Sequence, residues 1–268
     1  MISHQAPPPE GGTDEDASPL RFLCTNDDGI DASGLELLIQ AAEKLGEVFV
    51  VAPDRQRSAS SHSLTLHSPI RPTEVSAGRI TLDGTPTDCV LIAISELCEH
   101  RPDFVLSGVN HGPNMGEDVL YSGTVAAAME GTILHVPSIA FSFAGRDDDR
   151  LAGYADLLER LLRGLVTRDD FPKETFLNIN LPDLPADEVL GSRVTVLGRR
   201  RYLDSINRRL DPAGREFFWI GGGTPEWKRN ADSDFSAVDA GHVSITPLHL
   251  DLTNFRLIEE VGNWPLEL

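Results

Sequence analysis

The sequence predicts an α/β protein whose mostly parallel sheet is covered by helices on both faces. Three observations support this fold class. Several short segments are apolar throughout, as in strands that are buried on both faces. These segments alternate with stretches that carry apolar residues at helical spacing, which is typical of parallel strands joined by crossover helices. The chain has 268 residues, of which 40% are hydrophobic, and this is enough for a sizeable core.

The first strand–helix–strand unit illustrates the pattern. Residues 21–25 form a short apolar run that ends in a polar Asn-Asp-Asp-Gly sequence, so we expect a buried strand followed by a loop. Apolar residues at helical spacing over 33–45, closed by a glycine, predict a helix. Residues 47–52 are again apolar and end at a proline, which predicts the next parallel strand.

The middle of the chain continues this alternation. The same reasoning predicts helices at 88–97, 125–130 and 151–165, and strands at 104–109, 136–142 and 176–181. The Ser-Gly-Thr sequence before the second of these helices is a helix-cap signal. A long polar loop, 111–121, separates it from the preceding strand.

The pattern changes after residue 182. We predict strands at 193–197, 216–220 and 242–247, a polar loop at 232–236, and a terminal helix or tail at 257–268. The arm between the first two strands is basic, with Arg199, Arg200, Arg201, Arg208, Arg209 and Arg215 facing only Asp204 and Asp211. We divide the chain into a proline-rich, acidic, disordered tail (1–19), a core (20–190) and a C-terminal segment (191–268) that completes the fold.

Charge and cysteine usage narrow the functional classes. A net charge of −19 argues against nucleic acid polymers and anionic membranes as partners, because both need a basic face. A small phosphate ligand remains compatible, since a metal or backbone N–H groups can override the average field at one site. The three cysteines form no CxxC pair, and no targeting or membrane-spanning segment is visible, so we expect a cytoplasmic protein.

The most informative feature is the sequence Asn26-Asp27-Asp28-Gly29 at the end of the first predicted strand. Ligands of open α/β sheets bind outside the carboxyl ends of the strands. Adjacent carboxylates there repel each other unless a cation or a proton lies between them, and such oxygen ligands suit Mg²⁺, Mn²⁺ or Ca²⁺. The alternative is a turn without a metal, since aspartate and glycine are also common turn residues.

Three further polar segments belong to the same predicted edge. The loop 53–63 carries cations and hydroxyls that can bind phosphate oxygens, unless it is only a solvated loop. Segment 107–116 offers the neutral oxygen of Asn110, and His111 as an acid or base or as an ordinary loop residue. Residues 121–124 open a helix, which provides either an anion site or a plain cap. Together these are parts that a phosphoester hydrolase needs.

Several other enzyme classes lack their motifs in this sequence. There is no GxxxxGK[ST] for a P-loop NTPase, and no GxGxxG follows the first strand as in dinucleotide-binding proteins. A GxSxG elbow and an HExxH zinc motif are also missing. These gaps favour a phosphoester hydrolase over the alternatives.

Five motifs in chain order resemble those of the SurE (survival protein E) family. They are TNDDGI at 25–30, VAPDRQRS at 51–58, GTPTDC at 84–89, SGVNHGPNMG at 107–116 and YSGTVAAAMEG at 121–131. The similarity extends from about Arg21 to at least Leu252, and five ordered motifs are far more specific than any one of them. Two departures are small: Cys24 stands where many relatives have an aliphatic residue, and His111 is at a position that varies in the family.

The resemblance implies a metal-dependent 5′-nucleotidase, which hydrolyses nucleoside 5′-monophosphates to nucleoside and phosphate. Some members also accept 3′-nucleotides or short polyphosphate. The implied fold is a Rossmann-like core with a C-terminal strand, arm and helix extension used in oligomerisation, so a homodimer or homotetramer is expected. Carried over position by position, the ligands of one divalent cation per subunit, Mg²⁺ or Mn²⁺, are Asp27, Asp28, Ser58 and Asn110.

In the resulting hypothesis, the cation polarises the phosphoryl oxygens and lowers the pKa of the attacking water, while Asp27 or Asp28 also acts as the catalytic base. The candidate phosphate-binding residues are Asn26, Asn114, Ser122, Gly123 and Thr124. A haloacid-dehalogenase type of enzyme is a rival, but it needs a DxD sequence directly after the first strand, where this chain has two adjacent acids instead. A nucleotide-binding regulatory module without hydrolysis is the other alternative, although a binder gains little from paired carboxylates.

Overall fold

The computed structural model describes most of the chain. The described residues are 19–168, 170–172, 174–202, 206–220, 225–227 and 230–265. The predicted N-terminal tail lies almost entirely outside them. Among the described residues, no helix is both long enough and apolar enough to cross a membrane.

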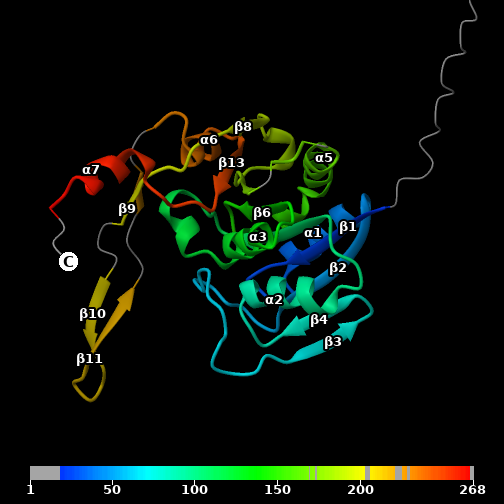
Figure 1. Ribbon diagram of the computed structural model, residues 1–268, viewed down its shortest axis with the longest axis horizontal. Helices are drawn as coiled ribbons and strands as arrows, with labels where there is room; N and C mark the ends of the chain where they lie inside the picture. Colours follow the sequence, from blue (N-terminus) through cyan, green and yellow to red (C-terminus); the bar gives the residue numbers. More distant parts are fainter. Residues whose placement is uncertain are drawn as a thin grey trace, which may run out of the picture.

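A single large sheet organises the fold (Figure 1). Its strands in the described chain follow the order β3-β4-β2-β1-β5-β6-β7-β13-β8. Their bounds are β1 Leu20–Thr25, β2 Gly46–Pro53, β3 Pro72–Ser76, β4 Arg79–Leu82, β5 Phe104–His111, β6 Ser138–Phe143, β7 Thr175–Leu181, β8 Ser192–Val194 and β13 Val243–His249. The six strands from β4 to β7 in this order run parallel, whereas β3 and β13 are antiparallel to their neighbours β4 and β7. The predicted α/β fold with a mostly parallel sheet is therefore confirmed.

The chain direction places a ligand crevice at β1. From β1 the chain moves outward through β2 to β4, and it then returns to pair β5 with the other side of β1. The connections on either side of β1 therefore diverge, and ligands of open α/β sheets bind in the crevice that forms at such a point, here the carboxyl ends of β1 and β5. The predicted acidic pair follows β1, and Asn110 lies near the end of β5.

Helices cover both faces of the sheet (Figure 1). One face packs against α1 (Ser33–Glu43), α4 (Asp148–Ala152) and α5 (Ala155–Val166) in the largest hydrophobic core. The other face packs against α2 (Pro86–Ile92), its π-helical extension Ala93–Leu97, and α3 (Gly123–Ile133). Close approach requires Gly34 in α1, because a Cβ there would lie 2.0 Å from the carbonyl oxygen of Val109.

Two local predictions need correction, and one hairpin was missed. The predicted helix at 151–165 is two helices, because the chain turns at Gly153 and the buried Tyr154 hydroxyl bonds to the Pro182 and Leu184 carbonyls. The predicted loop at 232–236 instead begins α6 (Asp234–Asp239), which the Ser233 hydroxyl caps. The hairpin β3–β4 was not predicted, since every residue of β3 is exposed and its sequence has no apolar alternation.

The C-terminal segment has two structural roles. Strand β13 extends the large sheet, whereas β10 (Ile206–Leu210) and β11 (Glu216–Ile220) form a hairpin that projects away from it (Figure 1). Strands β9 (Arg200–Tyr202) and β12 (Pro225–Trp227) pair at its base, and short helices at Phe255–Leu257 and α7 (Ile258–Gly262) follow β13.

The hairpin corrects the picture of an unbroken basic arm. Strand β10 lies within the segment that the sequence predicts as a polar arm, and β11 follows that segment directly. Arg208 pairs with Glu216 and Arg215 with Asp211, while Arg200 pairs with Asp118 of the core. These arginines are therefore matched by carboxylates, one of them distant in sequence.

Candidate active site

The loop after β1 is both a turn and an acidic site. The Asn26 side chain closes it, because its Nδ2 donates to the Gly29 carbonyl at 2.8 Å and its Oδ1 accepts from the Gly29 N–H at 3.1 Å. Gly29 has a φ of +103°, a conformation that favours glycine. Asn26 and Gly29 thus form the turn, which leaves the carboxylates of Asp27 and Asp28 to contact other segments.

Asp27 faces the N-terminus of α3. Its carboxylate accepts hydrogen bonds from the Thr124 hydroxyl and from the backbone N–H of Gly123, and only 5% of the residue is exposed. Burial raises the pKa of Asp27 to about 6, with a further increase from the charge of Asp28, and the hydrogen bonds oppose this rise only in part. A carboxylate with this environment is stabilised by a cation at neutral pH.

Asp28 connects two other segments. One of its oxygens accepts from Gln56 Nε2 at 3.2 Å, and the other accepts from the His111 backbone N–H at 3.3 Å. The Arg57 N–H also donates to the Asp27 carbonyl at 2.7 Å. The two acids therefore contact the loop after β2, the end of β5 and the start of α3. The structure brings together the four polar segments that the sequence placed at one edge.

The loop after β2 bends over the start of α3. Ser61 donates its N–H to the Tyr121 carbonyl at 3.1 Å and its hydroxyl to the Leu120 carbonyl at 2.6 Å. Ser58 lies in this loop, directly after Arg57, and is exposed. The loop thus passes from Asp27 to the connection before α3, and Ser58 is on the solvent side of that path.

Asn110 and His111 end strand β5. Asn110 Nδ2 donates to the Gly112 carbonyl at 2.7 Å, so the amide oxygen Oδ1 points away from that contact. The His111 ring lies between two carboxylates, with Nε2 2.8 Å from Asp148 Oδ1 and Nδ1 3.9 Å from Asp28 Oδ2. Hydrogen bonds from Ser33 and then from His111 lower the pKa of Asp148.

The predicted phosphate-binding residues already have partners within the chain. Asn114 contacts strands β6 and β7, because its N–H donates to Asn180 Oδ1 and its Nδ2 donates to Ser142 Oγ, both at 2.8 Å. The Ser122 hydroxyl caps α3 by accepting from the Val125 N–H. Together with the turn formed by Asn26 and the contacts of Gly123 and Thr124 with Asp27, these bonds build the site, and a direct role toward phosphate stays a prediction.

Four contributors to the site were not predicted from the sequence. They are Gln56, Ser60, Asp148 and the pair His62–Glu130. Each comes from a loop or helix end whose partner is distant in sequence, so motif spacing carried no signal for them. The polarity of the loop 53–63 was the only signal in the sequence, and it covered Gln56, Ser60 and His62.

The donor set fits a hard divalent cation. In the described part of the chain, no group of three or more His, Cys, Asp and Glu side chains is arranged to hold a metal. Two adjacent carboxylates with neutral oxygens from asparagine and serine are nevertheless what Mg²⁺ uses when substrate phosphates and waters complete its shell. The raised pKa of Asp27 is the observation that favours a cation, because among the described residues no counter-charge lies within hydrogen-bond distance of this buried carboxylate.

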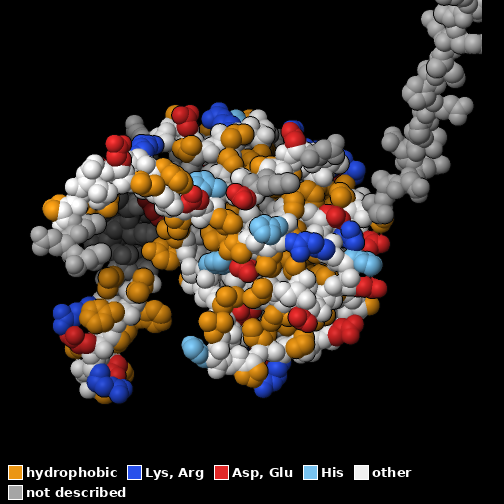
Figure 2. All heavy atoms as spheres, viewed as in Figure 1, with side chains coloured by type: hydrophobic (Ala, Val, Ile, Leu, Met, Phe, Trp, Pro, Cys, Tyr) orange, Lys and Arg blue, Asp and Glu red, His pale blue; other side chains and the backbone are white. Residues whose placement is uncertain are grey.

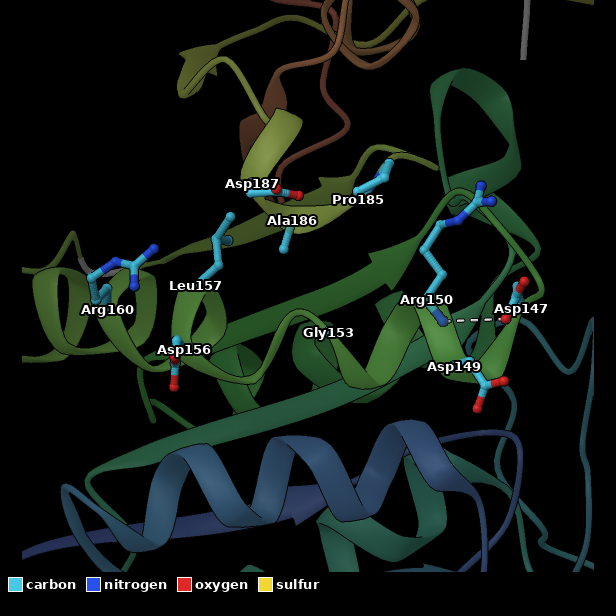
Figure 3. A pocket seen from close by; sticks show the side chains of 10 residues that line it. All are labelled: Asp147, Asp149, Arg150, Gly153, Asp156, Leu157, Arg160, Pro185, Ala186 and Asp187. Carbon is cyan, nitrogen blue, oxygen red and sulfur yellow. Dashed lines mark hydrogen bonds between the residues drawn. The ribbon is translucent and has the colours of Figure 1, made fainter.

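A groove lies on another part of the surface, away from the acidic pair. This groove, of about 690 Å³, runs between α4, α5 and the segment Ala186–Glu188 (Figure 3). Its lining residues are Asp147, Asp149, Arg150, Gly153, Asp156, Leu157, Arg160, Pro185, Ala186 and Asp187. None of the predicted site residues lines it, so this groove is separate from the acidic pair.

The fold and the site together define a class of protein. It is an α/β protein with an oxygen-lined acidic site where its parallel strands end, beside the N-terminus of a helix. Such a site suits metal-assisted chemistry on a small anionic substrate.

Comparison with known proteins specifies the family. The family model of survival protein SurE matches residues 22–204. The "5′-nucleotidase SurE" of Gemmatimonas aurantiaca is 57% identical over 248 residues, covering 91% of this chain and 98% of the relative. That of Geotalea uraniireducens is 45% identical over 92% of this chain and 100% of its own. The crystal structure of SurE from Aquifex aeolicus superposes with a TM-score of 0.81 at 42% identity, covering 90% and 98%. The chain belongs to the SurE family.

Proposed function

We propose that the protein is a metal-dependent 5′-nucleotidase that hydrolyses nucleoside 5′-monophosphates to nucleoside and phosphate. Relatives that are 44–57% identical to this chain are described as 5′-nucleotidases, which supports this activity. The observation that carries the proposal is the convergence of four segments on Asp27 and Asp28. The same convergence argues against a regulatory module, which does not need two adjacent carboxylates.

The residues that would hold one divalent cation are Asp27, Asp28, Ser58 and Asn110. When bound, such a cation, Mg²⁺ or Mn²⁺, supplies charge stabilisation for the phosphoryl oxygens and activation of water. The Thr124 hydroxyl and the Gly123 N–H orient Asp27, and Gln56 with the His111 N–H orients Asp28. These bonds fix both carboxylates before substrate arrives, which reduces the reorganisation needed during the reaction.

Proton transfer and phosphate binding involve neighbouring groups. Asp27 or Asp28 accepts the proton of the attacking water as the catalytic base, since both carboxylates lie at the crevice. The partial positive charge at the N-terminus of α3 attracts the phosphate, which Ser122, Gly123 and Thr124 border. Asn26 and Asn114 support this arrangement by fixing the two loops that border the crevice.

The crevice also limits the range of substrates. A mononucleotide brings one phosphate to one cation, whereas a long polyanion meets the net charge of −19 without a basic face. Hydrolysis of 3′-nucleotides and short polyphosphate belongs to the proposal, because each also presents a terminal phosphate.

We further propose a homodimer or homotetramer in the cytoplasm. The hairpin β10–β11 exposes hydrophobic side chains far from the core, with Ile220 87% exposed and Phe218 58% exposed (Figure 2). Monomers seldom leave such a patch open to water. All three cysteines are free thiols, and burial raises the pKa of Cys98 to about 11, which is compatible with a reducing compartment.

The test is phosphate release by the purified protein with Mn²⁺ or Mg²⁺. AMP, 3′-AMP and tripolyphosphate are compared before and after EDTA, and with the variant Asp27→Asn. We expect AMP hydrolysis that EDTA abolishes and that Asp27→Asn eliminates while the fold persists. Nucleotide binding that EDTA leaves unchanged, without phosphate release, would support the regulatory module instead.

A further inference from the structure

A buried hydroxyl at the site has no assigned role. The Ser60 Oγ atom is shielded from solvent, and no hydrogen-bond partner for it exists among the described residues. Buried polar atoms in native proteins nearly always have a partner, and leaving one unsatisfied is unfavourable. An orphan hydroxyl of this kind is explained when the missing partner is a ligand.

Ser60 lies beside Asp27 and the first residue of α3. A Cβ at Gly123 would meet Ser60 Oγ at 2.7 Å, Asp27 Cβ at 2.8 Å and Asp27 Oδ2 at 3.1 Å. The serine hydroxyl and the carboxylate therefore converge on one point at the first residue of α3. Because Gly123 has no side chain, both groups can pack closely against its backbone.

The strap loop, residues 54–66, holds Ser60 in this place. Its start is fixed to Asp27 by Arg57, and its middle to the connection before α3 by Ser61. His62 Nε2 lies 2.7 Å from Oε2 of Glu130, a residue of α3 that is only 5% exposed.

Further along the strap loop, Thr65 donates its N–H to Asp88 Oδ1 at 2.9 Å and its hydroxyl to Oδ2 at 2.6 Å. Asp88 also closes the capping box of α2. The strap loop is thus attached on both sides of Ser60, to the site before it and to α2 and α3 after it. The position of its hydroxyl is set by these anchors.

We infer that Ser60 binds substrate: its hydroxyl donates a hydrogen bond to a phosphate oxygen of the nucleotide. This inference rests on the proposed function and extends it to a residue outside the metal-ligand set. A hydroxyl can donate its proton to an anionic oxygen, and the N-terminus of α3 favours an anion at the same point. A hydrogen bond to a charged group is stronger than one between neutral groups, so its loss is measurable.

The experiment compares Ser60→Ala and Ser60→Cys with wild type at saturating Mn²⁺. Ser68→Ala is the matched control, because Ser68 is an exposed serine just beyond the strap loop. The readouts are KM and kcat for AMP, the Kd of inorganic phosphate by calorimetry, the Mn²⁺ concentration for half activation, and the midpoint of thermal unfolding. Turnover of AMP by the wild-type protein tests the proposed function without reference to Ser60. Failure of the proposed function can therefore be distinguished from failure of the inference about Ser60.

We expect both Ser60 variants to raise KM for AMP and the Kd of phosphate about tenfold. Half activation by Mn²⁺ stays unchanged, and the unfolding midpoint stays the same or rises, because the Ser60 hydroxyl makes no hydrogen bond to the described part of the chain. Wild-type phosphate affinity in Ser60→Ala overturns the inference. So does a change confined to Mn²⁺ activation, which would make Ser60 a metal ligand. If Ser60→Cys has the KM and Kd of wild type while Ser60→Ala is impaired, the effect is due to packing. This result would also overturn the inference.

Discussion

At the scale of single residues, the ionisation of Asp27 dominates the site. Its pKa is raised from 3.8 to about 6 because the side chain is buried, and the adjacent charge of Asp28 acts in the same direction. At neutral pH the metal-free protein therefore carries a carboxylate whose charge is poorly compensated. A cation removes this penalty, and a proton competes with the cation when the pH falls below about 6.

This environment predicts how metal-free stability depends on pH. A raised carboxyl pKa contributes stability that is complete below the unfolded pKa near 4 and is lost as the pH rises through about 6. Asp27→Asn removes that loss. We expect the free energy of unfolding of the variant, relative to wild type, to increase by about 2 kcal/mol between pH 4 and pH 8.

Urea unfolding after EDTA treatment measures this difference. Saturating Mn²⁺ is the control, since a cation bound to the folded state stabilises wild type and should cancel or reverse the advantage of the variant. A stability difference that is the same at pH 4 and pH 8 without metal would contradict the assigned cause.

At the scale of elements, the first turn of α3 packs against both Asp27 and Ser60. Gly123→Ala would place a Cβ within 3.0 Å of Ser60 Oγ and Asp27 Cβ. Either the strap loop, which carries Ser60, or the loop after β1, which carries Asp27, must then shift. Small displacements of reacting groups are costly to catalysis. We expect kcat/KM for AMP to fall by at least about tenfold while the protein still folds.

Gly164→Ala in α5 is the matched control for this substitution. Nothing lies within 4 Å of the Cβ that it adds, so activity should equal that of wild type and stability should rise by up to about 1 kcal/mol. Activity of Gly123→Ala equal to that of the control would show that the close packing at α3 is not required.

The elements also show what the sequence could and could not predict. Buried parallel strands such as β1 and β5 are continuous apolar runs, and their polar ends marked Asp27 and Asn110 directly. Strand β3 lacked a pattern because it is exposed at the sheet edge. Ser60 was not singled out because its role depends on a contact with α3, more than sixty residues away, and no local spacing encodes that contact.

At the scale of the whole molecule, the exposed hairpin is the feature that a monomer does not explain. Ile206 pairs with Ile220 and Arg208 with Phe218 across the hairpin, so these side chains share one face. The apolar members of that face are exposed in the chain as described. A partner subunit that covers this face would remove these apolar side chains from water, and this burial would stabilise the oligomer.

We therefore expect the double substitution Phe218→Asp and Ile220→Asp to dissociate the oligomer. Light scattering coupled to size-exclusion chromatography measures the mass of each species at equal concentration. Val75→Asp, at an exposed apolar position on β3 at one edge of the large sheet, is the control and should leave the mass unchanged. An unchanged oligomer in the double variant, or a monomeric wild type, would contradict the proposal.

The charge of the whole molecule agrees with this account of the site. A net charge of −19 disfavours polyanionic partners, yet in the proposed site two of those carboxylates would bind a cation. Under this proposal the negative charge limits substrate size without opposing phosphate chemistry. The matched arginines of the arm do not alter this balance.

The most direct measurement is Mn²⁺ binding by calorimetry to EDTA-treated wild type and Asp27→Asn, paired with phosphate release from AMP by the same samples. We predict one bound cation per wild-type subunit and hydrolysis that follows its occupancy. Asp27→Asn should retain its fold and lose both binding and hydrolysis. Full AMP hydrolysis by the variant, or wild-type hydrolysis without any divalent cation, would contradict the account.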